Sequence, residues 1–502
     1  MNRQAHAAGV ELDDIQGLVR FGYKHHTEAC FLLLCIKSRE AARAWLAAAS
    51  VASAVALDPP PPTVLQIALT SEGLRVLGVA DDIIAGFSPE FVEGMSGNPN
   101  RERRLGDVGA NEPMRWRWGA EPRLPHVLVA LYATPGRLDD WQHAIEAQCK
   151  TGFERIACLR SSDLHDFEPF GFRDGISQPQ PDWERQRAAR DEERQSYTNL
   201  SCLGEFLLGY PNEYGGYTER PLLDLQRGAA PLLPRAEEAP DRADLGRNGS
   251  YLVMRQLRQD VSGFWRFLDG QAGGNPVVRE KLAEAMVGRT LSGEPLTLSP
   301  GQVVAGNGTA PAADLNAFTY EADPQGLRCP LGAHIRRTNP RNADLPPGAP
   351  GLVSWLMRTL GFDGEALRQD LVASTRFHRL LRRGREYGAA VPLSQALTGA
   401  QGGDETGLHF ICLNANIGRQ FEFVQGAWVM GTKFNGLSGE SDPLLGHRLP
   451  YADGSPTDGY SIQQADGPDK RLAGLPQFVT VVGGAYFFLP GIRALRYLVT
   501  AA

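Results

Sequence analysis

Short apolar runs alternate with amphipathic segments in both halves of the chain, and this alternation restricts the possible folds more than any other feature. Residues 29–36 (ACFLLLCI) have the composition of a buried strand, and residues 38–49 follow with a capping serine and apolar side chains at helical spacing. Further strands are predicted at 64–69 and 126–132, and a helix from 139 to about 149. This order predicts an α+β fold in which an antiparallel sheet carries helices on one face.

The same alternation returns in the second half. Strands are predicted at 251–257 and 408–413, with helical segments through about residue 287 and at 420–429. The second half should therefore repeat the α+β architecture of the first.

The last apolar segment is interrupted at Gly483-Gly484. A Gly-Gly pair between two apolar runs, 478–482 and 485–489, predicts a closing hairpin. With the mixed-charge and proline-rich stretches in the middle, we divide the chain into an N-terminal half (1–165), a connecting segment (166–250) and a C-terminal half (251–502).

Composition narrows the class of protein. With 42% hydrophobic and 22% charged residues the chain should fold as a globular protein. The net charge is -7 and the basic residues are scattered along the sequence, so we expect no positive surface that would attract the phosphate backbone of a nucleic acid. Nucleic acid is therefore not an expected partner. No apolar run approaches the ~18 residues of a membrane span. No leader pattern precedes the acidic residues 11–14, so we expect a cytoplasmic protein with no membrane partner.

The seven cysteines include no C-x-x-C pair. This spacing argues against a disulfide framework and against a structural zinc site. We expect most of the thiols to be small buried side chains: Cys30, Cys35, Cys149, Cys158, Cys202, Cys329 and Cys412.

One carboxylate, Asp174, stands in the glycine-bracketed stretch 171–179 (GFRDGISQP). Glycine and aspartate are common turn residues, so an ordinary turn is one interpretation. A carboxylate in such a loop can also reach a cavity with little shielding, and there it can take and return a proton.

A histidine, His334, stands in the stretch 329–341 (CPLGAHIRRTNPR). It is one of ten histidines, and a structural role is one interpretation. Gly332 and Ala333 remove side-chain bulk just before it, as a planar cofactor lying against the backbone would require. The arginines that follow, of which Arg341 is the last, are suited to carboxylates. This context favours an axial ligand to haem iron.

A basic cluster at 379–388 (RLLRRGREYG) is the third motif. If this stretch is a helical turn, Arg379 and Arg382 share a face. An ordinary basic helix end is one interpretation; a guanidinium that stabilises charge on bound peroxide is another.

The strand predicted at 408–413 adds a fourth, weaker signal. Strand alternation would place Leu408 and Phe410 on one face, where they could wall an apolar pocket. The same alternation turns His409 away, unless a bulge makes it a second distal base.

These segments, in this order, resemble those of the dye-decolourising peroxidases, specifically the longer members of that haem family. The similarity extends over nearly the whole chain. The resemblance implies two ferredoxin-like halves, with haem b (iron protoporphyrin IX) held mainly by the C-terminal half.

The resemblance also implies the role of each motif residue. Asp174 would be the distal acid and Arg382 the distal arginine. His334 would be the proximal iron ligand, for which Glu422 is a guessed hydrogen-bond partner. The other implied residues are Arg379 and, less firmly, Arg341 at the haem propionates, Leu408 and Phe410 in the distal wall, and Tyr387 as an oxidisable tyrosine near the surface.

The implied activity is reduction of hydrogen peroxide coupled to one-electron oxidation of organic donors such as dyes and phenolics. Bulky donors would react at the surface, through Tyr387 or a tryptophan such as Trp265, Trp355 or Trp428. Two other classes remain open: a protein that stores, delivers or strips haem without peroxide turnover, and a chlorite-converting haem enzyme. The expected oligomeric state is a monomer or a homodimer.

Overall fold

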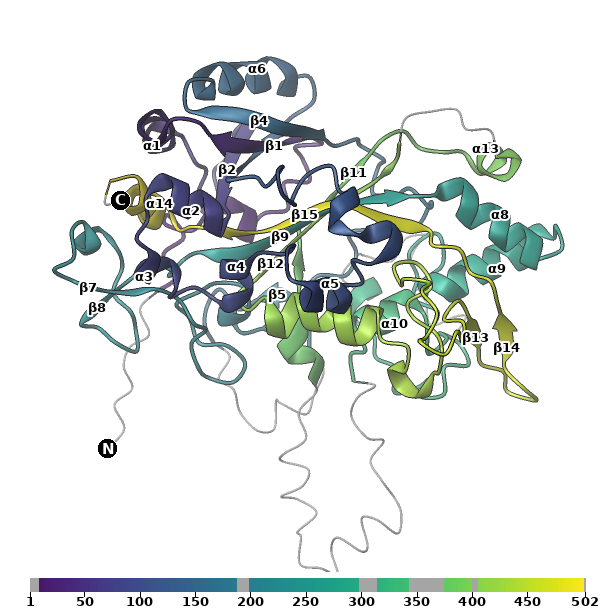
Figure 1. Ribbon diagram of the computed structural model, residues 1–502. Helices are drawn as coiled ribbons and strands as arrows, with labels where there is room; N and C mark the ends of the chain where they lie inside the picture. Colours follow the sequence, from purple (N-terminus) through teal and green to yellow (C-terminus); the bar gives the residue numbers. More distant parts are fainter. Residues whose placement is uncertain (1–8, 187–197, 298–313, 343–373, 400–404, 501–502) are drawn as a thin grey trace, which may run out of the picture.

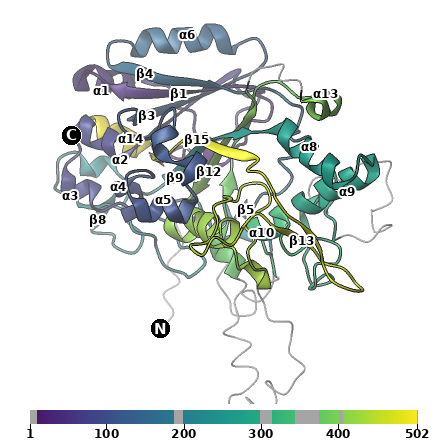
Figure 2. The same ribbon diagram turned by 45° about the vertical axis from the view of Figure 1, so that its right-hand side comes forward.

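The computed structural model describes residues 9–186, 198–297, 314–342, 374–399 and 405–500 (Figure 1). Within these residues a nine-stranded sheet runs in the order β10-β12-β9-β15-β2-β3-β1-β4, and β11 pairs with β12. The strand β15 crosses the middle of the molecule between the two ends of the sheet (Figures 1 and 2).

The N-terminal half supplies one end of this sheet. Its elements are β1 (Glu28–Ile36), α1 (Arg39–Ala48), β2 (Thr63–Leu69), β3 (Val127–Ala133), α6 (Leu138–Cys149) and β4 (Phe153–Arg160). Antiparallel pairing gives the order β2-β3-β1-β4, which is the arrangement of a ferredoxin-like unit. As predicted, Ser38 caps α1, because its hydroxyl accepts the N–H of Ala41 at 3.3 Å.

The C-terminal half repeats the arrangement. Its elements are β9 (Ser250–Gln259), α8 (Val261–Gln271), α9 (Pro276–Val287), β10 (Leu381–Arg382), β11 (Arg385–Tyr387), β12 (Gly407–Asn414), the π-helices η8 (Gly418–Glu422) and η9 (Val424–Val429), and β15 (Val479–Leu489). Phe488 of β15 pairs with Leu69 of β2, so the two ferredoxin-like halves share one sheet. The predicted fold class is confirmed, whereas the domain limits at 165 and 250 stay predictions.

Shorter elements fill the connections. The remaining described helices longer than one turn are α2 (Ser71–Leu77), α3 (Asp81–Ile84), α4 (Pro89–Glu93), α5 (Pro99–Leu105), α10 (His334–Thr338), α13 (Leu393–Thr398) and α14 (Ile492–Thr500), with the 3-10 segment η7 at Ser374–His378. Two-stranded ribbons pair β5 (Gln180–Pro181) with β6 (Leu200–Ser201), β7 (Leu222–Asp224) with β8 (Arg242–Asp244), and β13 (Tyr460–Ile462) with β14 (Lys470–Leu472). Among the described residues, no helix is both long and apolar enough to cross a bilayer.

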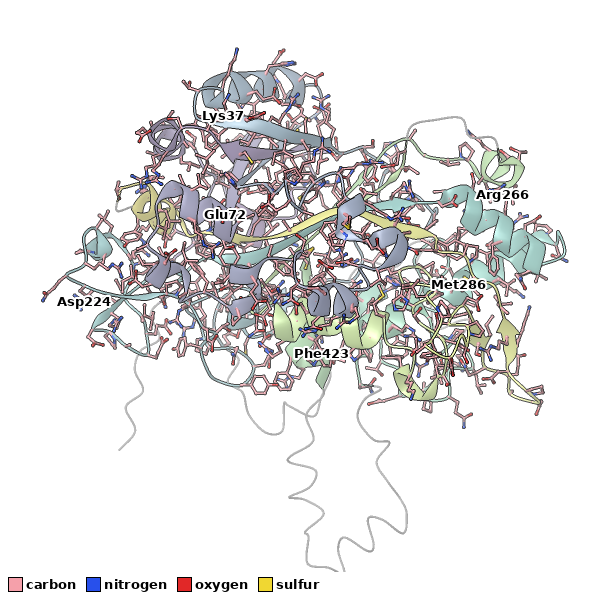
Figure 3. The ribbon with its side chains drawn as sticks, in the orientation of Figure 1. Lys37, Glu72, Asp224, Arg266, Met286 and Phe423 are labelled. Atoms are coloured by element: carbon pink, nitrogen blue, oxygen red, sulfur yellow. The ribbon has the colours of Figure 1, made fainter. Side chains whose placement is uncertain are left out.

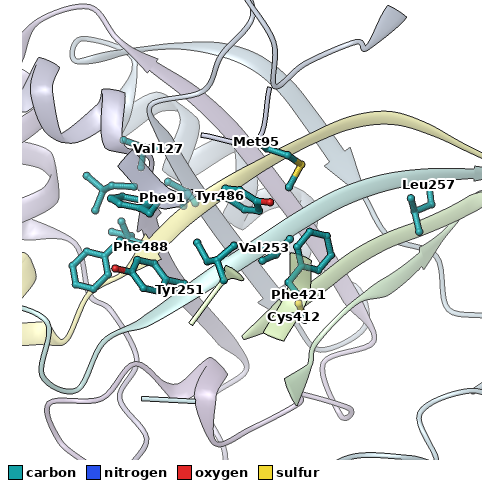
Figure 4. Packing of buried hydrophobic residues seen from close by; sticks show 14 of the residues in the cluster. Phe91, Met95, Val127, Tyr251, Val253, Leu257, Cys412, Phe421, Tyr486 and Phe488 are labelled. Carbon is teal, nitrogen blue, oxygen red and sulfur yellow. The ribbon is translucent and has the colours of Figure 1, made fainter. Parts of the chain in front are cut away.

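Both faces of the sheet are buried, which explains why residues 29–36 are continuously apolar. On β1, Leu32 and Leu34 belong to the core beneath the helices, whereas Phe31 and Leu33 belong to a second core. That second face is covered by segments around residues 15–19 and 203–210, which contain short 3-10 turns rather than α-helices. Figure 4 shows the first core, in which Tyr251 and Phe488 on neighbouring strands pack together.

The predicted closing hairpin is wrong, because residues 479–489 form the single strand β15. A bulge between Val481 and Gly483 shifts its register against β9. Gly483 is needed for close packing: a Cβ there would lie 2.4 Å from the indole nitrogen of Trp118, which donates to Gln256 at 2.9 Å. Glycine at this position therefore allows the Trp118 indole to lie close to the backbone of β15, and it does not mark a turn.

Replacing Gly483 with alanine should test this explanation. The added methyl overpacks a fixed indole, so we expect the free energy of unfolding to fall by about 1–3 kcal/mol in a denaturant titration. Gly216→Ala is the matched control, since a Cβ at Gly216 has no heavy atom within 4 Å. Equal stability of the two variants would contradict the packing role of Gly483.

Candidate haem and peroxide site

A cavity of about 590 Å³ lies where the three sequence motifs meet. Its volume is within the range of about 300–1,000 Å³ typical of ligand and cofactor sites. Seven of the eight predicted site residues line it: Asp174, His334, Arg341, Arg379, Arg382, Leu408 and Phe410. Residues far apart in the chain are thus brought to one chamber.

The Asp174 loop is held by its own backbone. Gly171 and Gly175 have φ values of 96° and 72°, in the left-handed region that favours glycine. The carboxylate of Glu168 accepts the N–H groups of Phe170 and Phe172, each at 3.0 Å. Asp174 itself donates its backbone N–H to the Asp166 carbonyl at 2.8 Å. The loop is therefore fixed with the Asp174 side chain, 36% accessible, in the cavity lining.

Arg382 lies on the short strand β10, so the predicted helical turn is wrong. Leu381 and Arg382 pair with β12, and this pairing supplies the hydrogen bonds that their backbone N–H and C=O groups would otherwise make within a helix. The Gln178 amide exchanges hydrogen bonds with the main chain of Arg382 at 3.0 and 3.2 Å. Its guanidinium donates to the Ser177 carbonyl at 2.9 Å and lies 3.4 Å from Asp174 Oδ1. The motif 171–179 thus positions both residues of the predicted catalytic pair.

The electrostatics of this pair favour an ionised Asp174. Burial alone would raise the pKa of the carboxyl. The positive charge of Arg382, the N–H of Gly175 and the nearby His334 outweigh burial, so the pKa of Asp174 lies below its ordinary value. Asp174 is therefore ready to accept a proton.

His334 is the first residue of α10 and is oriented by a buried carboxylate. Its Nδ1 lies 2.9 Å from Oδ2 of Asp442, whose other oxygen accepts the N–H groups of Leu444 and Leu445 at 2.9 Å. Asp442 thereby fixes the proton on Nδ1 and leaves Nε2 as the ring nitrogen that can bind iron. A quarter of the His334 side chain is accessible, and it lines the cavity.

One expectation around His334 is wrong and another stays a prediction. Gly332 lies against protein side chains, because a Cβ there would lie 3.2 Å from Leu437 and Tyr460, and its role beside a planar cofactor stays a prediction. Glu422 is not the partner of the histidine, since its buried carboxylate binds Arg101 at 2.7 Å, Arg104 at 2.6 Å and Tyr486 at 3.0 Å. Asp442 takes that place, and no local motif in the sequence identifies it.

Asp442→Asn should weaken cofactor binding. An amide cannot hold the His334 imidazole as a carboxylate does, so haem affinity should fall by about 10–100-fold, measured as the rate of haem transfer to an apo-globin acceptor. Glu422→Gln is the control, because it should lower stability without a comparable loss of haem affinity. Equal haem loss in the two variants would contradict the pairing.

One end of the cavity is strongly cationic. Burial, then the charges of Arg341 and Arg382, lower the pKa of the neighbouring Arg289 to about 10. Arg379 donates to the Thr198 carbonyl at 2.8 Å, and Arg341 donates to the carbonyls of Asn316 and Phe318 at 2.9 and 2.7 Å. An anionic group placed here would relieve the repulsion, and Arg289 was not among the predicted residues.

The apolar wall matches the predicted strand alternation. Leu408 and Phe410 pack on the core beneath the helices and line the cavity, together with Phe421 and residues of η9. His409 turns its ring to the opposite face, where Nε2 lies 3.1 Å from the Arg160 carbonyl and the ring meets Phe31 edge-on. The ring contacts follow the predicted strand alternation, and the orientation of His409 relative to haem stays a prediction.

The predicted surface relay stays a prediction. Tyr387 is 7% exposed, stacks on His409 at 4.5 Å and donates to Glu405 at 3.0 Å, whose side chain is 26% exposed, so the ring is buried close to the surface. Trp265 is also buried and donates to the Phe170 carbonyl at 3.1 Å. Trp428 is half-buried in the cavity lining, whereas Trp355 lies outside the described residues.

A second histidine, His378, lines the cavity and was not predicted. Its Nδ1 lies 2.5 Å from the Arg419 carbonyl, and its ring stacks on Phe423 at 3.8 Å. Phe423, labelled in Figure 3, lies between the two π-helices. His378 is thus the alternative to His334 that any test of the iron ligand must exclude.

These features fit haem b. His334 offers one ring nitrogen toward the cavity, apolar side chains from β12, η8 and η9 can contact a porphyrin, and the arginine end suits two propionates. Asp174 and Arg382 line the same chamber, where a small oxidant can reach both.

Comparison with known proteins agrees with this geometry. No family model matches the chain. It is 28% identical over 453 residues to the multifunctional dye peroxidase DyP2 of an Amycolatopsis species, covering 86% of this chain and 82% of that protein. It is 26% identical over 517 residues to a dye-decolorizing peroxidase of Mycetinis scorodonius, covering 98% and 88%. The crystal structure of a fungal DyP-type peroxidase from Auricularia auricula-judae superposes with a TM-score of 0.72 at 25% identity, covering 98% of this chain and all of that one.

Proposed function

The chain belongs to the dye-decolourising peroxidases, and we propose that it is a haem b enzyme that reduces hydrogen peroxide and oxidises organic donors such as dyes and phenols by one-electron steps. The observation that carries the proposal is the assembly of Asp174, Arg382 and the Asp442-oriented His334 around one cavity.

The binding residues follow from the lining. His334 Nε2 would hold the iron, and Arg379 and Arg341 would pair with the propionates, with Arg289 adding positive charge at that end. Leu408 and Phe410 would contact the porphyrin. When bound, the iron would supply the redox chemistry that peroxide reduction requires.

Asp174 and Arg382 perform the proton and charge steps. The Asp174 carboxylate takes the proton from one oxygen of hydrogen peroxide and delivers it to the other, which leaves as water. The Arg382 guanidinium, fixed by Ser177 and Gln178, stabilises the negative charge that develops as the O–O bond breaks. Because the backbone already fixes both groups, little reorganisation is needed during the reaction.

The pH below which the reaction with peroxide slows should depend on Arg382. Since the pKa of Asp174 lies below its ordinary value, the bimolecular rate with peroxide should stay constant as the pH falls from neutral through the ordinary range of a carboxyl and then fall as the base is protonated. Arg382→Leu removes the largest of the effects that oppose burial, so the midpoint should move to higher pH. Arg383→Leu is the control, because that guanidinium binds the Leu18 and Val19 carbonyls at 2.8 and 2.9 Å. Identical midpoints in all three proteins would contradict the assignment.

Haem storage or delivery is the alternative function. It needs His334 and the arginine end of the cavity but not Asp174 and Arg382. Adding peroxide and an anthraquinone dye to the haem-loaded protein separates the two. A peroxidase bleaches many dye molecules per chain with the Soret band retained, whereas loss of that band without dye oxidation would overturn the proposal. A cytoplasmic location and a monomeric or homodimeric state stay predictions.

A further inference from the structure

The helix α6 lies beside β4 and β1 at the edge of the sheet (Figures 1 and 2). Two thiols meet on this side, one on each strand. The sulfur atoms of Cys30 on β1 and Cys158 on β4 lie 3.3 Å apart. Cys30 pairs in register with Arg160, and Cys158 with Leu32, so the two cysteines are diagonal neighbours on one face. Their closeness was not expected from the spacing of the cysteines.

The surroundings of Cys158 favour its thiolate. Its pKa is lowered to about 7, first by the hydrogen bond that it shares with Cys30 and then by the charges of Arg155 and Arg160, against burial and the Glu146 carboxylate. Cys158 is half-buried and Cys30 is fully buried. A small oxidant can therefore reach Cys158, whereas Cys30 is buried next to it.

The hydrogen bonds around the two cysteines also favour a thiolate at Cys158. The amide nitrogen of Gln142 on α6 donates to Cys158 Sγ at 3.3 Å, and its carbonyl oxygen accepts from Arg160 at 3.1 and 2.9 Å. The site thus places a donor, two cations and a second thiol around one reactive sulfur.

We propose that Cys158 and Cys30 form a peroxide-sensitive dithiol, in which Cys158 reacts with a hydroperoxide and Cys30 resolves the product to a disulfide between β4 and β1. The inference rests on the proposed function only for the identity of the oxidant. It adds a second peroxide-reactive site that lies outside the haem cavity.

The chemistry balances. The Cys158 thiolate attacks one oxygen of hydrogen peroxide, the O–O bond breaks, and hydroxide leaves and is protonated to water, leaving Cys158 as a sulfenic acid. The Cys30 thiol then attacks that sulfur, the S–O bond breaks, and the hydroxyl leaves as a second water with the Cys30 proton. Two thiols are oxidised and one peroxide is reduced.

The bond requires a small movement of the strands, because diagonal cross-strand neighbours are ordinarily about 7–8 Å apart and a disulfide needs about 4.4–6.8 Å between Cα atoms. The sulfur atoms must close from 3.3 Å to the roughly 2.05 Å of a disulfide. β4 is the last strand of the sheet and pairs only on its β1 side among the described strands. It can therefore shift toward β1 without breaking a second strand pair.

The test is peptide mapping of the full-length, haem-loaded protein after brief treatment with hydrogen peroxide. A non-reduced digest should contain a Cys30–Cys158 linked peptide that dithiothreitol removes. In Cys30→Ser, dimedone should trap a sulfenic acid on Cys158; in Cys158→Ser, Cys30 should stay a free thiol. Recovery of both free thiols in the wild-type protein would overturn the proposal.

Cys35 provides the matched control, because it is also half-buried on β1 but donates to the Leu124 carbonyl, and burial raises its pKa. Cys35→Ser should keep the linked peptide, and dimedone should label Cys158 more than about tenfold faster than Cys35 at neutral pH. Equal labelling would contradict the site. His334→Ala should also form the link, so failure of the haem assignment and failure of the dithiol are distinguishable.

Discussion

His334→Ala should abolish haem binding. Asp442 binds Nδ1 of this residue, and we propose that Nε2 binds the iron, so its removal should eliminate the Soret band and with it all peroxide-dependent dye oxidation. The measurement is haem content per chain after expression with added haem, together with the visible spectrum.

His378→Ala is the control for this prediction, because His378 lines the same cavity. That variant should keep one haem per chain and an unchanged Soret band. If His334→Ala retains the wild-type spectrum, or if His378→Ala loses it instead, the assignment of the iron ligand is wrong.

Asp174→Asn should slow the reaction with peroxide by about 10²–10⁴-fold, because the amide cannot take and return a proton. Arg382→Leu should cost about 10²–10³-fold, because charge on the departing oxygen is no longer stabilised. The measurement is the second-order rate of the spectral change after peroxide addition in a stopped-flow instrument. The double variant should lose less than the product of the two effects, because the groups lie 3.4 Å apart and act on one step.

Asp166→Asn is the matched control. Asp166 belongs to the same cavity mouth, but its side chain is exposed and lies 3.7 Å from Lys24. Asparagine tolerates its positive φ of 67°, so the loop should keep its shape and the rate should stay near the wild-type value. An unchanged rate in Asp174→Asn, or an equal loss in Asp166→Asn, would remove Asp174 from the proton step.

Local patterns predicted the architecture where local physics decides it. The apolar run 29–36 and the Ser38 cap identified β1 and α1, and alternation at 408–410 assigned each side chain to the correct face of β12. These features depend on residues that are close together in the chain, so they can be predicted from a single sequence.

Features set by distant contacts were not predictable in the same way. The partner of His334 is 108 residues away, and nothing near Asp442 marks it. Gly483 was interpreted as a turn because its true constraint, the Trp118 indole, comes from the other half of the chain. The burial of Tyr387 depends on Glu405 and His409, and the strand at Arg382 depends on β12.

The order of the three motifs in the chain indicated a common function, which none of the motifs indicates alone. Each motif alone was compatible with a turn, a structural histidine or a basic helix end. Their convergence on one cavity is the structural result that gives them a common chemistry.

A crystal structure of the haem-loaded protein would show which histidine binds the iron and on which face of the porphyrin Asp174 lies. We expect iron bonded to His334 Nε2, with Asp174 and Arg382 over the opposite face of the porphyrin and the propionates toward the arginine end. Iron bonded to His378, or Asp174 on the same face as the bound histidine, would contradict it.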